Sequence, residues 1–462
     1  MIQKEKKYIF VLGLGVSGMS LVLYLRKKKI LVSCWDDNIK IREKAKKKKI
    51  NLVNINRETF KKCNLLVLSP GINHQKENPH KAIILAKKLK IKIVTDIELL
   101  KTLKFKNFLI GVTGTNGKTT TTDFIQKVIS FRGYKESKTC GNIGIPFTDL
   151  KVNNKSILIV EASSFQLSKI DKLRFDIAFL LNISPDHIEW HGNTTNYINA
   201  KLRIFENQNK DCHSVICIDD DYSKRIASEF KKRFDAKLLK ISTKYSKNTD
   251  FYLSQNKNSI KIFNYLNKES LEIPKDEIKF TKAEHNYQNL LSAYVAGYLL
   301  GQKKENFVKS LKNLGNLDHR MELVGNLKNI FFYNDSKSTN VSSAKTAINS
   351  VKNIFWLLGG REKKGGFSGL EKNMKNVKKA YSFGESGKKI KEFLNKNSVD
   401  CVYFKTLEEC FERAFNDGLK YKIKINMLLS PACASFDQYL NYELRGQMFK
   451  TLVKKKLKIY EL

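Results

Sequence analysis

The segment 113–119, with the sequence TGTNGKT, constrains the fold of this chain more than any other. It follows the apolar run 108–112 and precedes the helical pattern of 120–129. A strand that enters a helix through a glycine-rich turn directs backbone N–H groups and the positive helix end toward an anion. The segment therefore predicts a variant P-loop in which Lys118 reaches the terminal phosphates, although Val112 stands where the strict pattern has glycine. A glycine-rich turn without a ligand is the alternative interpretation.

A second glycine motif lies near the start of the chain. Gly13, Gly15 and Gly18 have the GxGxxG spacing directly after the apolar run 8–12. Asp36 follows at the end of a second apolar run, about 20 residues further on. In a strand–turn–helix context this spacing is the dinucleotide fingerprint, which suits NAD(P) and any other nucleotide diphosphate equally.

The same region has to be distinguished from a membrane anchor. Residues 1–7 are basic and residues 8–25 are mostly apolar, which resembles a signal anchor. The glycine spacing, the β-like run 30–35 and the lack of a small-residue cleavage site argue against this interpretation. We therefore expect a soluble, cytoplasmic protein.

Short apolar runs alternate with helical patterns along the whole chain, which is typical of parallel sheets covered by helices. The predicted strands are 8–12, 30–35, 65–68, 91–94, 108–112, 157–160, 177–181, 214–218, 330–333, 354–358, 380–383 and 425–429, with further short strands within 243–280. The predicted helices include 17–28, 81–90, 120–129 and 286–300. We predict an α/β protein of three domains with mostly parallel sheets: a Rossmann-like domain (1–97), a central P-loop domain (98–316) and a C-terminal Rossmann-like domain (317–462).

The charge of the chain is strongly positive. A formal net charge of +40 in 462 residues is typical of nucleic-acid-binding proteins. The lysines are spread along the chain without interleaved aromatic residues, so we interpret most of them as solvated faces that steer an anionic substrate. We expect neither a nucleic acid nor a membrane as a partner, and the eight cysteines, which lack paired spacing, indicate reduced thiols rather than a zinc site.

Polar residues follow the predicted strands of the central region, where ligands bind in open α/β sheets. Glu161 ends a strand and could hold Mg²⁺ beside phosphates, or cap a helix. His187 and His191 could share a helix face and bind zinc, but the HExxH order is absent. We prefer a single His187 beside a phosphate-bound Mg²⁺, with a structural role as the alternative for either histidine. Lys201, taken alone, is an ordinary helix lysine.

In the C-terminal region Lys337, Lys363 and Ser435 follow neighbouring strands. Two point charges and a directional donor would suit a small substrate with two carboxylates. Solvated loop lysines are the alternative in a chain so rich in lysine.

Eight motifs give the chain a family resemblance. In chain order they are TGTNGKT, VEASSFQL, NISPDHIEWHG with a downstream AKLRIF, EHNYQN, DHRMELV, NDSKSTN, LLGGREKKGGF and LSPACASFDQY. This series resembles the Mur ligase family over essentially the whole chain. The resemblance implies an ATP-dependent ligase of peptidoglycan synthesis that joins D-glutamate to UDP-N-acetylmuramoyl-L-alanine through an acyl phosphate. It also implies a monomer that acts only on small molecules.

The resemblance further implies roles for individual residues. The catalytic residues would be Lys118, His187 and Lys201. The ATP-binding residues would be Gly114, Thr115, Asn116, Gly117, Lys118, Thr119, Thr120, Asn286, Arg320 and Asp335. The UDP-substrate would contact Gly15, Ser17, Gly18, Asp36 and Asn142. The amino acid would contact Lys337, Thr339, Lys363, Ser435 and Phe436. Mg²⁺ would be held by Thr119, Glu161, His187 and Lys201, the last as a lysine carbamate formed with CO₂.

Some alternatives stay open at this stage. The neighbouring Lys364 could take the place of Lys363. A ligase of the same scaffold that adds a diamino acid, or a folate polyglutamate synthase, would carry similar motifs. A basic, NTP-dependent nucleic-acid-binding protein is the alternative from a different class.

Overall fold

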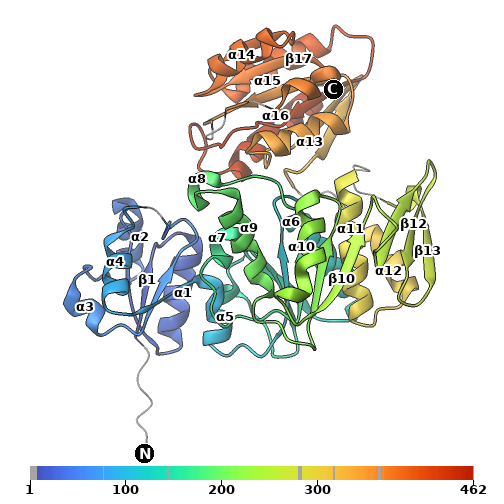
Figure 1. Ribbon diagram of the computed structural model, residues 1–462. Coiled ribbons are helices and arrows are strands. Elements are labelled where there is room, and N and C mark those ends of the chain that lie inside the picture. The colour runs from blue at the N-terminus through green and yellow to red at the C-terminus, as the bar shows by residue number, and fades with distance from the viewer. Residues whose placement is uncertain are drawn as a thin grey trace, which may run out of the picture. The chain divides into compact units, whose positions relative to one another are not determined.

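The computed structural model describes residues 8–75, 77–142, 145–278, 284–315, 318–362, 366–367 and 369–460. These residues form sheets of four, nine and six strands, covered by helices (Figure 1). Neighbouring strands run parallel except in the pairs β11–β12, β12–β13 and β14–β15. The first two sheets belong to one compact unit, Met1–Leu314, and the third belongs to a second, Gly315–Leu462. The predicted α/β fold with mostly parallel sheets is confirmed.

The first sheet has the strand order β2-β1-β3-β4. Its strands are β1 (Tyr8–Leu12), β2 (Leu31–Trp35), β3 (Leu65–Leu68) and β4 (Lys92–Thr95). Its helices are α1 (Val16–Lys27), α2 (Ile39–Lys47), α3 (Arg57–Lys61) and α4 (Lys81–Lys88). Side chains of β1 alternate between two cores: Ile9 and Val11 face one, and Phe10 and Leu12 face the other. Both faces of the strand are therefore buried, as expected for a parallel sheet with helices on each side.

The central sheet has the order β13-β12-β11-β10-β9-β8-β5-β7-β6, so β5 lies between β7 and β8. Its strands are β5 (Phe108–Thr113), β6 (Ser137–Gly141), β7 (Ile157–Glu161), β8 (Ile177–Leu180), β9 (His213–Cys217), β10 (Lys237–Ser242), β11 (Phe251–Gln255), β12 (Ser259–Asn264) and β13 (Glu269–Pro274). Its helices are α5 (Leu99–Thr102), α6 (Lys118–Ile129), α7 (Ser164–Leu167), α8 (Ile188–His191), α9 (Thr194–Leu202), α10 (Asp221–Glu229), α11 (Glu284–Leu299) and α12 (Lys304–Ser310). Helices α6 and α11 pack against each other over one face of the sheet.

The third sheet has the order β14-β15-β19-β16-β17-β18. Its strands are β14 (Glu322–Leu327), β15 (Ile330–Asn334), β16 (Ile354–Gly359), β17 (Val377–Phe383), β18 (Cys401–Phe404) and β19 (Ile425–Leu429). Its helices are α13 (Val341–Ser350), α14 (Gly387–Lys396), α15 (Leu407–Gly418) and α16 (Tyr442–Tyr460). The carboxyl ends of β15, β19, β16 and β17 are neighbours, which brings the loops after these strands together.

Buried polar contacts join the first sheet to the central sheet. The Asp96 carboxylate accepts a hydrogen bond from Gln166 Nε2 at 3.1 Å. The Glu98 carboxylate accepts from the backbone N–H groups of residues 171–173 at 2.8–3.1 Å. Ser20 Oγ hydrogen-bonds to Thr148 Oγ1. Burial raises the pKa of Asp96 to about 6. The two sheets are therefore linked by side chains that are withdrawn from solvent.

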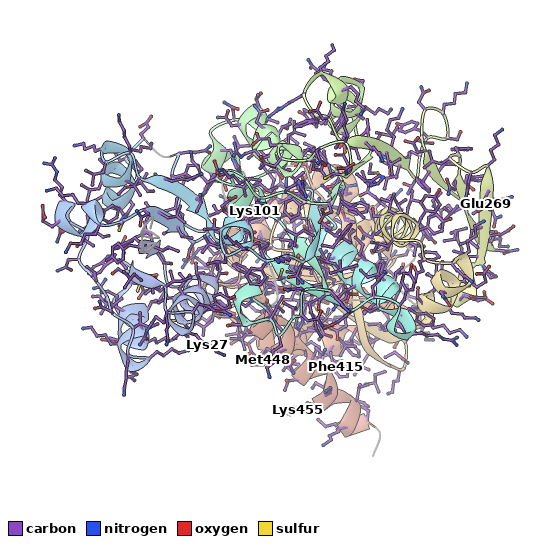
Figure 2. The ribbon with its side chains drawn as sticks, turned by 90° about the horizontal axis from the view of Figure 1, so that it is seen from below. Lys27, Lys101, Glu269, Phe415, Met448 and Lys455 are labelled. Atoms are coloured by element: carbon purple, nitrogen blue, oxygen red, sulfur yellow. The ribbon has the colours of Figure 1, made fainter. Side chains whose placement is uncertain are left out.

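The apolar stretch at 8–25 is a strand, a turn and most of helix α1 rather than one long helix. Among the residues described, no helix is both long and apolar enough to cross a bilayer. Lysines lie on the surface of many elements: Lys27 on α1, Lys101 on α5 and Lys455 on α16 are all exposed (Figure 2).

Candidate functional site

The segment 113–119 forms the turn between β5 and α6. Gly117 caps the helix with φ of +86°, and a Cβ there would lie 2.6 Å from Asn289 Oδ1, so the turn requires glycine. Asn182, which follows β8, accepts from Asn116 N at 2.8 Å and donates to Asn116 O at 3.2 Å. The turn is thus held in shape from the neighbouring strand, with the start of an α-helix behind it, as a phosphate-binding turn needs.

Two lysines meet at one backbone carbonyl of this turn. Lys118 Nζ donates to Gly114 O at 2.9 Å and to Thr115 O at 3.0 Å. Lys201 Nζ, from α9, donates to the same Gly114 O at 2.7 Å. Lys201 is only 2% exposed, and its burial, together with the Lys118 charge, lowers its pKa well below the ordinary value. The neutral amine of Lys201 is therefore favoured far more than in a surface lysine.

Tyr197 supports this pair and was missed by sequence reasoning. Its hydroxyl hydrogen-bonds to Thr115 Oγ1 at 2.9 Å, and its ring centroid lies 4.7 Å from Lys201 Nζ. Burial raises the pKa of the Tyr197 hydroxyl, so the phenol stays neutral. The available signal was its position four residues before Lys201, which places both side chains on one helix face.

Glu161 and Asn142 come together at the ends of the adjacent strands β7 and β6. Asn142 Nδ2 donates to Glu161 Oε1 at 3.1 Å, and Asn142 N donates to Glu161 O at 2.8 Å. Glu161 is 2% exposed. Both the Glu161 charge and the Asp186 charge act on Lys201 and oppose the fall of its pKa. A carboxylate therefore lies within electrostatic range of the lysine pair at the phosphate turn, and Asn142 is held beside that carboxylate.

The two histidines of the central region have different surroundings. His187 adopts a left-handed backbone with φ of +53° and lies partly exposed, with Nε2 3.5 Å from Asp186 Oδ2. His191 is buried, its Nε2 lies 3.0 Å from Ser164 Oγ, and its ring stacks on Phe165. Burial lowers the pKa of His191 to about 4, so it is neutral at physiological pH. This environment matches a structural role for His191. Of the two histidines, only His187 has a side chain that solvent can reach.

The first glycine motif forms the turn between β1 and α1. Gly13 has φ of +89°, and a Cβ on Gly18 would lie 2.0 Å from Gly13 O. Asp36 Oδ2 accepts from Leu14 N at 2.6 Å, so this carboxylate shapes the turn from the end of β2. Ser17, near the start of α1, lines a small cavity that Gly141 of β6 also lines. Gly15 precedes the helix with no atom within 4 Å of the place of a Cβ.

Helix α11 carries Asn286 beside the central turn. Asn289 Nδ2 donates to Asn286 Oδ1 at 3.1 Å, and Asn289 Oδ1 accepts from Thr121 Oγ1 at 3.0 Å. The helix that follows the phosphate turn and the helix that carries Asn286 are therefore coupled by side-chain hydrogen bonds. Thr119 and Thr120 lie in the first turn of α6.

The second unit has its own cluster at its strand ends. Asp335 is buried and accepts from Ser430 Oγ at 2.8 Å, from Met321 N at 3.2 Å and from Ser338 Oγ. Burial raises the pKa of Asp335 to about 6, against the opposing effects of these donors and of Arg320. The hydrogen bond from Ser430, which follows β19, therefore fixes the loop after β15 against the loop after β19.

The residues predicted to bind an amino acid lie on these same loops. Lys337 Nζ lies 5.4 Å from the ring centroid of Tyr442, a residue that sequence reasoning did not single out. Thr339 N donates to Lys337 O at 2.8 Å. Ser435 is buried and Phe436 is 65% exposed. Lys363 and Lys364 lie outside the described residues.

Arg445, on α16, is a buried charged residue of the second unit that the sequence analysis did not identify. It is fully buried and donates to Ser336 Oγ at 3.0 Å, Ser336 O at 2.9 Å, Gly359 O at 3.3 Å and Cys433 O at 3.1 Å. One guanidinium thereby ties together the loops after β15 and β19 and the last residue of β16. Burial lowers the pKa of Arg445 to about 10, so the group stays charged at neutral pH.

These sites define the chain as a nucleotide-binding α/β protein with a P-loop-type turn. Three family models match it: the N-terminal domain of MurD-like Mur ligases over residues 7–95, the Mur ligase middle domain over 112–297 and the Mur ligase glutamate ligase domain over 319–425. The chain belongs to the Mur ligase family.

Relatives and solved structures agree with this assignment. The chain is 34% identical over 459 residues to UDP-N-acetylmuramoylalanine–D-glutamate ligase of Rickettsia prowazekii, with 98% of each chain covered. It is 32% identical to the Caulobacter vibrioides protein of the same name, over 97% of this chain and 96% of that one. MurC of Thermotoga maritima has the same fold, with a TM-score of 0.61, 17% identity, and 97% and 99% coverage. MurF of Thermotoga maritima, solved in complex with ADP, matches with a TM-score of 0.59, 15% identity, and 99% and 100% coverage.

Proposed function

We propose that this chain is an ATP-dependent ligase that joins the amine of D-glutamate to the L-alanyl carboxylate of UDP-N-acetylmuramoyl-L-alanine. The observation that carries the proposal is the identity of about one third to ligases of this name over 98% of the chain. Lys118 at the phosphate turn supplies the chemical support, since a phosphoryl-transfer site needs fixed positive charge.

The reaction has two steps. A carboxylate is a poor electrophile until one of its oxygens becomes a good leaving group. The L-alanyl carboxylate first attacks the γ-phosphorus of ATP, which gives an acyl phosphate and ADP. The amine of D-glutamate then attacks the acyl carbon and loses a proton, and the bond between the acyl carbon and the phosphate oxygen breaks, which releases inorganic phosphate. Lys118 neutralises charge on the phosphoryl group as it is transferred, because its ammonium already lies at the turn.

Mg²⁺ would supply electrostatic stabilisation of the phosphates, and the donor set fits a hard cation. Thr119, Glu161 and His187 would contribute to its binding. The described residues contain no cluster of three histidine, cysteine or acidic side chains around a possible metal position. The ATP phosphates and water would complete its coordination, and Lys201 as a carbamate is a further candidate ligand.

Lys201 is proposed to carry a carbamate. Only a neutral amine adds to CO₂, with loss of one proton, and burial beside Lys118 lowers the Lys201 pKa in the direction that this reaction requires. A carbamate would turn an unfavourable buried cation into an anion beside Lys118, with two oxygens available to a metal.

The substrates are assigned to the three sheets. UDP would bind at the first turn through Gly15, Ser17, Gly18 and Asp36, and Asn142 would contact the muramoyl part. The nucleoside and phosphates of ATP would be held by Gly114, Thr115, Asn116, Gly117, Thr120, Asn286, Arg320 and Asp335. D-Glutamate would be held by Lys337, Thr339, Lys363 or Lys364, Ser435 and Phe436. We assign the domains to 1–97, 98–316 and 317–462, and propose a cytoplasmic monomer.

The decisive experiment is an amino-acid screen. Purified protein with ATP, Mg²⁺ and UDP-N-acetylmuramoyl-L-alanine should release phosphate with D-glutamate and form the amide detected by mass spectrometry. L-Glutamate, meso-diaminopimelate and L-lysine should give no product. Lys118→Ala is the inactive variant, and Lys127→Ala on the same helix is its matched control, since Lys127 pairs with Asp123 at 2.8 Å instead. Amide formation with a diamino acid would instead indicate a ligase of that specificity. ATPase activity that DNA stimulates, without an amide product, would indicate a nucleic-acid-binding protein.

A further inference from the structure

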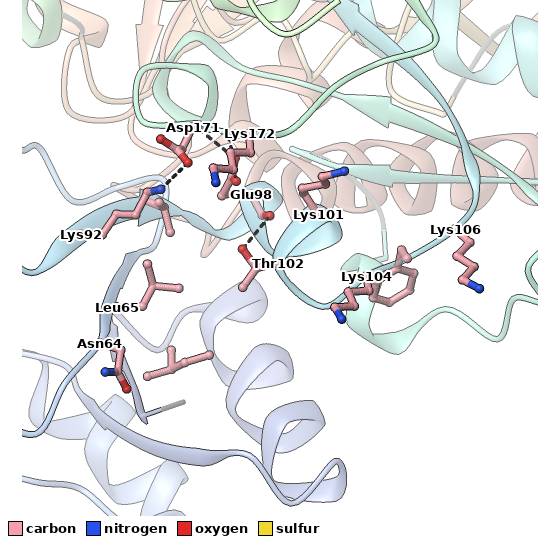
Figure 3. A pocket seen from close by; sticks show the side chains of 13 residues that line it. Asn64, Leu65, Lys92, Glu98, Lys101, Thr102, Lys104, Lys106, Asp171 and Lys172 are labelled. Atoms are coloured by element: carbon pink, nitrogen blue, oxygen red, sulfur yellow. Dashed lines mark hydrogen bonds and ion pairs between the residues drawn. The ribbon is translucent and has the colours of Figure 1, made fainter. Parts of the chain in front are cut away.

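A cavity of about 620 Å³ lies between the first sheet and the connector that leads to β5 (Figure 3). Ile9, Leu65 and Lys92 line it from the starts of β1, β3 and β4. The glycine turn at Gly13 follows the carboxyl end of β1. The cavity and this turn therefore lie at opposite ends of the strands of the first sheet. The volume is within the range of pockets that hold small organic molecules.

The interior of the cavity is largely apolar. Ile9, Leu65, Val94 and Phe105 contribute to its lining, and the first three come from neighbouring strands. Val94 and Ile9 are almost fully buried, so the half-buried side chains of Leu65 and Phe105 offer more of the apolar surface. An apolar ligand group placed here would be removed from water at about 25 cal/mol per Å² of its surface.

The rim of the cavity is positively charged. Five lysines line it, and they are Lys92, Lys101, Lys104, Lys106 and Lys172. The two acids present are already engaged: Asp171 pairs with Lys92, and Glu98 accepts three backbone hydrogen bonds from residues 171–173. Within the described part of the chain, the ammonium groups of the other four lysines form no ion pair. With five lysines and two acids, the lining therefore has a formal net charge of +3.

Figure 3 shows how these charges are arranged. Asn64 and Leu65 lie on the side of the first sheet, whereas Lys104 and Lys106 lie on the side of the connector. Lys172 lies beside Glu98. An elongated ligand with its apolar body toward Leu65 would direct an anionic group either toward Lys104 on the connector or toward Lys172 beside Glu98.

We propose that this cavity binds a small amphipathic organic anion, with a carboxylate or sulfonate at the lysine rim and an aromatic or aliphatic body against the apolar lining. The site is independent of the ligase reaction. Because its walls come from both the first sheet and the connector to β5, an occupant links these two parts of the unit.

The probe for the test is the fluorescent aromatic sulfonate 8-anilinonaphthalene-1-sulfonate. We expect saturable binding with one site per chain, displacement by octanoate, and no displacement by octyltrimethylammonium, which has an alkyl chain of similar length but the opposite charge. The double variant Lys104→Ser/Lys172→Ser should bind the probe about tenfold more weakly, equivalent to about 1.4 kcal/mol. The matched control Lys27→Ser/Lys455→Ser removes two exposed lysines elsewhere and should change the affinity less than twofold.

A second variant locates the site. Thr102→Phe adds bulk to a residue that lines the cavity and should also weaken binding, while circular dichroism reports that the fold is kept. Displacement of the probe by ATP would place it at the phosphate turn and overturn the proposal. Equal weakening in the lysine control, or equal displacement by the cationic surfactant, would overturn it as well. If the protein binds the probe but shows no ligase activity, the proposed function is contradicted and the proposed binding site is not.

Discussion

Replacement of Arg445 by methionine should destabilise the second unit strongly. Arg445 is 0% exposed and makes four hydrogen bonds, to the loops that follow β15 and β19 and to the last residue of β16. Methionine has a similar length and fills much of the space, but it has no donor. The carbonyl groups of Ser336, Gly359 and Cys433 would then lose this donor inside the protein.

The size of the effect follows from these contacts. A buried acceptor left without its donor costs about 1–3 kcal/mol, and three carbonyls lose one here. Removal of the costly buried guanidinium offsets part of this loss. We expect a net loss of about 3–5 kcal/mol, which is a large fraction of the roughly 5–15 kcal/mol that stabilises a domain. For a unit of this size the melting temperature should fall by roughly 10 °C.

The chain provides its own reporter for this measurement. Trp356 is the one tryptophan in the sequence of the second unit, and its Nε1 donates to Ser430 O at 2.8 Å, beside the loops that Arg445 holds. In a Trp35→Phe/Trp190→Phe background, urea unfolding followed by tryptophan emission therefore reports the second unit alone. Circular dichroism of the same samples follows the whole chain.

Arg413→Met is the matched control, because Arg413 lies on α15 in the same unit but its side chain is 53% exposed beside Asp417. A pair of this kind contributes less than about 1 kcal/mol. An unchanged unfolding midpoint in Arg445→Met, or an equal loss in Arg413→Met, would refute the assignment of Arg445 as the residue that holds these three segments together.

Three further outcomes are expected. Lys118→Ala should lower turnover at least about 100-fold with an unchanged melting curve, and unchanged turnover would contradict the role of the turn. Lys201→Ala should lose most activity and regain part of it with added formate or acetate, whereas no rescue would favour an unmodified lysine. Burial raises the pKa of Asp96 from 3.8 to about 6, so folding favours its protonated form. Its contribution to stability is present below about pH 4 and is lost as the pH rises through about 6. Asp96→Asn, which keeps the acceptor for Gln166, should therefore be more stable than the native chain by about 3 kcal/mol near pH 8 and nearly equal near pH 4, and a difference that does not vary with pH would show this account to be wrong.

The fold was predicted well where apolar runs are long and buried on both faces. β1, β5, β7, β16 and β19 lie where alternating strand and helix patterns placed them. The analysis did not find β6, β14 and β18, nor β10 (Lys237–Ser242), which lies between β9 and β11 inside the central sheet. β6 (Ser137–Gly141) lies at the edge of its sheet and contains one apolar residue, and β14 (Glu322–Leu327) is an antiparallel edge strand with a bulge. Edge strands pack on fewer neighbours, so their sequences carry less of the hydrophobic signal.

The candidate site was likewise predicted where it depends on local sequence and missed where it depends on long-range contacts. Gly117 and Lys118 were recognised because the turn chemistry is local: a glycine at positive φ and a lysine at the helix start are adjacent in the sequence. The setting of Lys201 was not recognised, because its pKa depends on contact with Gly114, 87 residues away, and on the charge of Lys118. For the same reason no periodicity singled out Arg445, whose partners lie at distant points of the chain.

The sequence by itself determined the α/β class, the phosphate turn and membership of the Mur ligase family, since these depend on short-range patterns and on motif order. Only the tertiary structure decided which side chains are withdrawn from water and beside which charges they lie. That difference separates Lys201 from the exposed lysines, His191 from His187, and Arg445 from an ordinary helix arginine. The physical reason is that desolvation and charge–charge interactions depend on distances in space, which chain folding sets and local sequence does not.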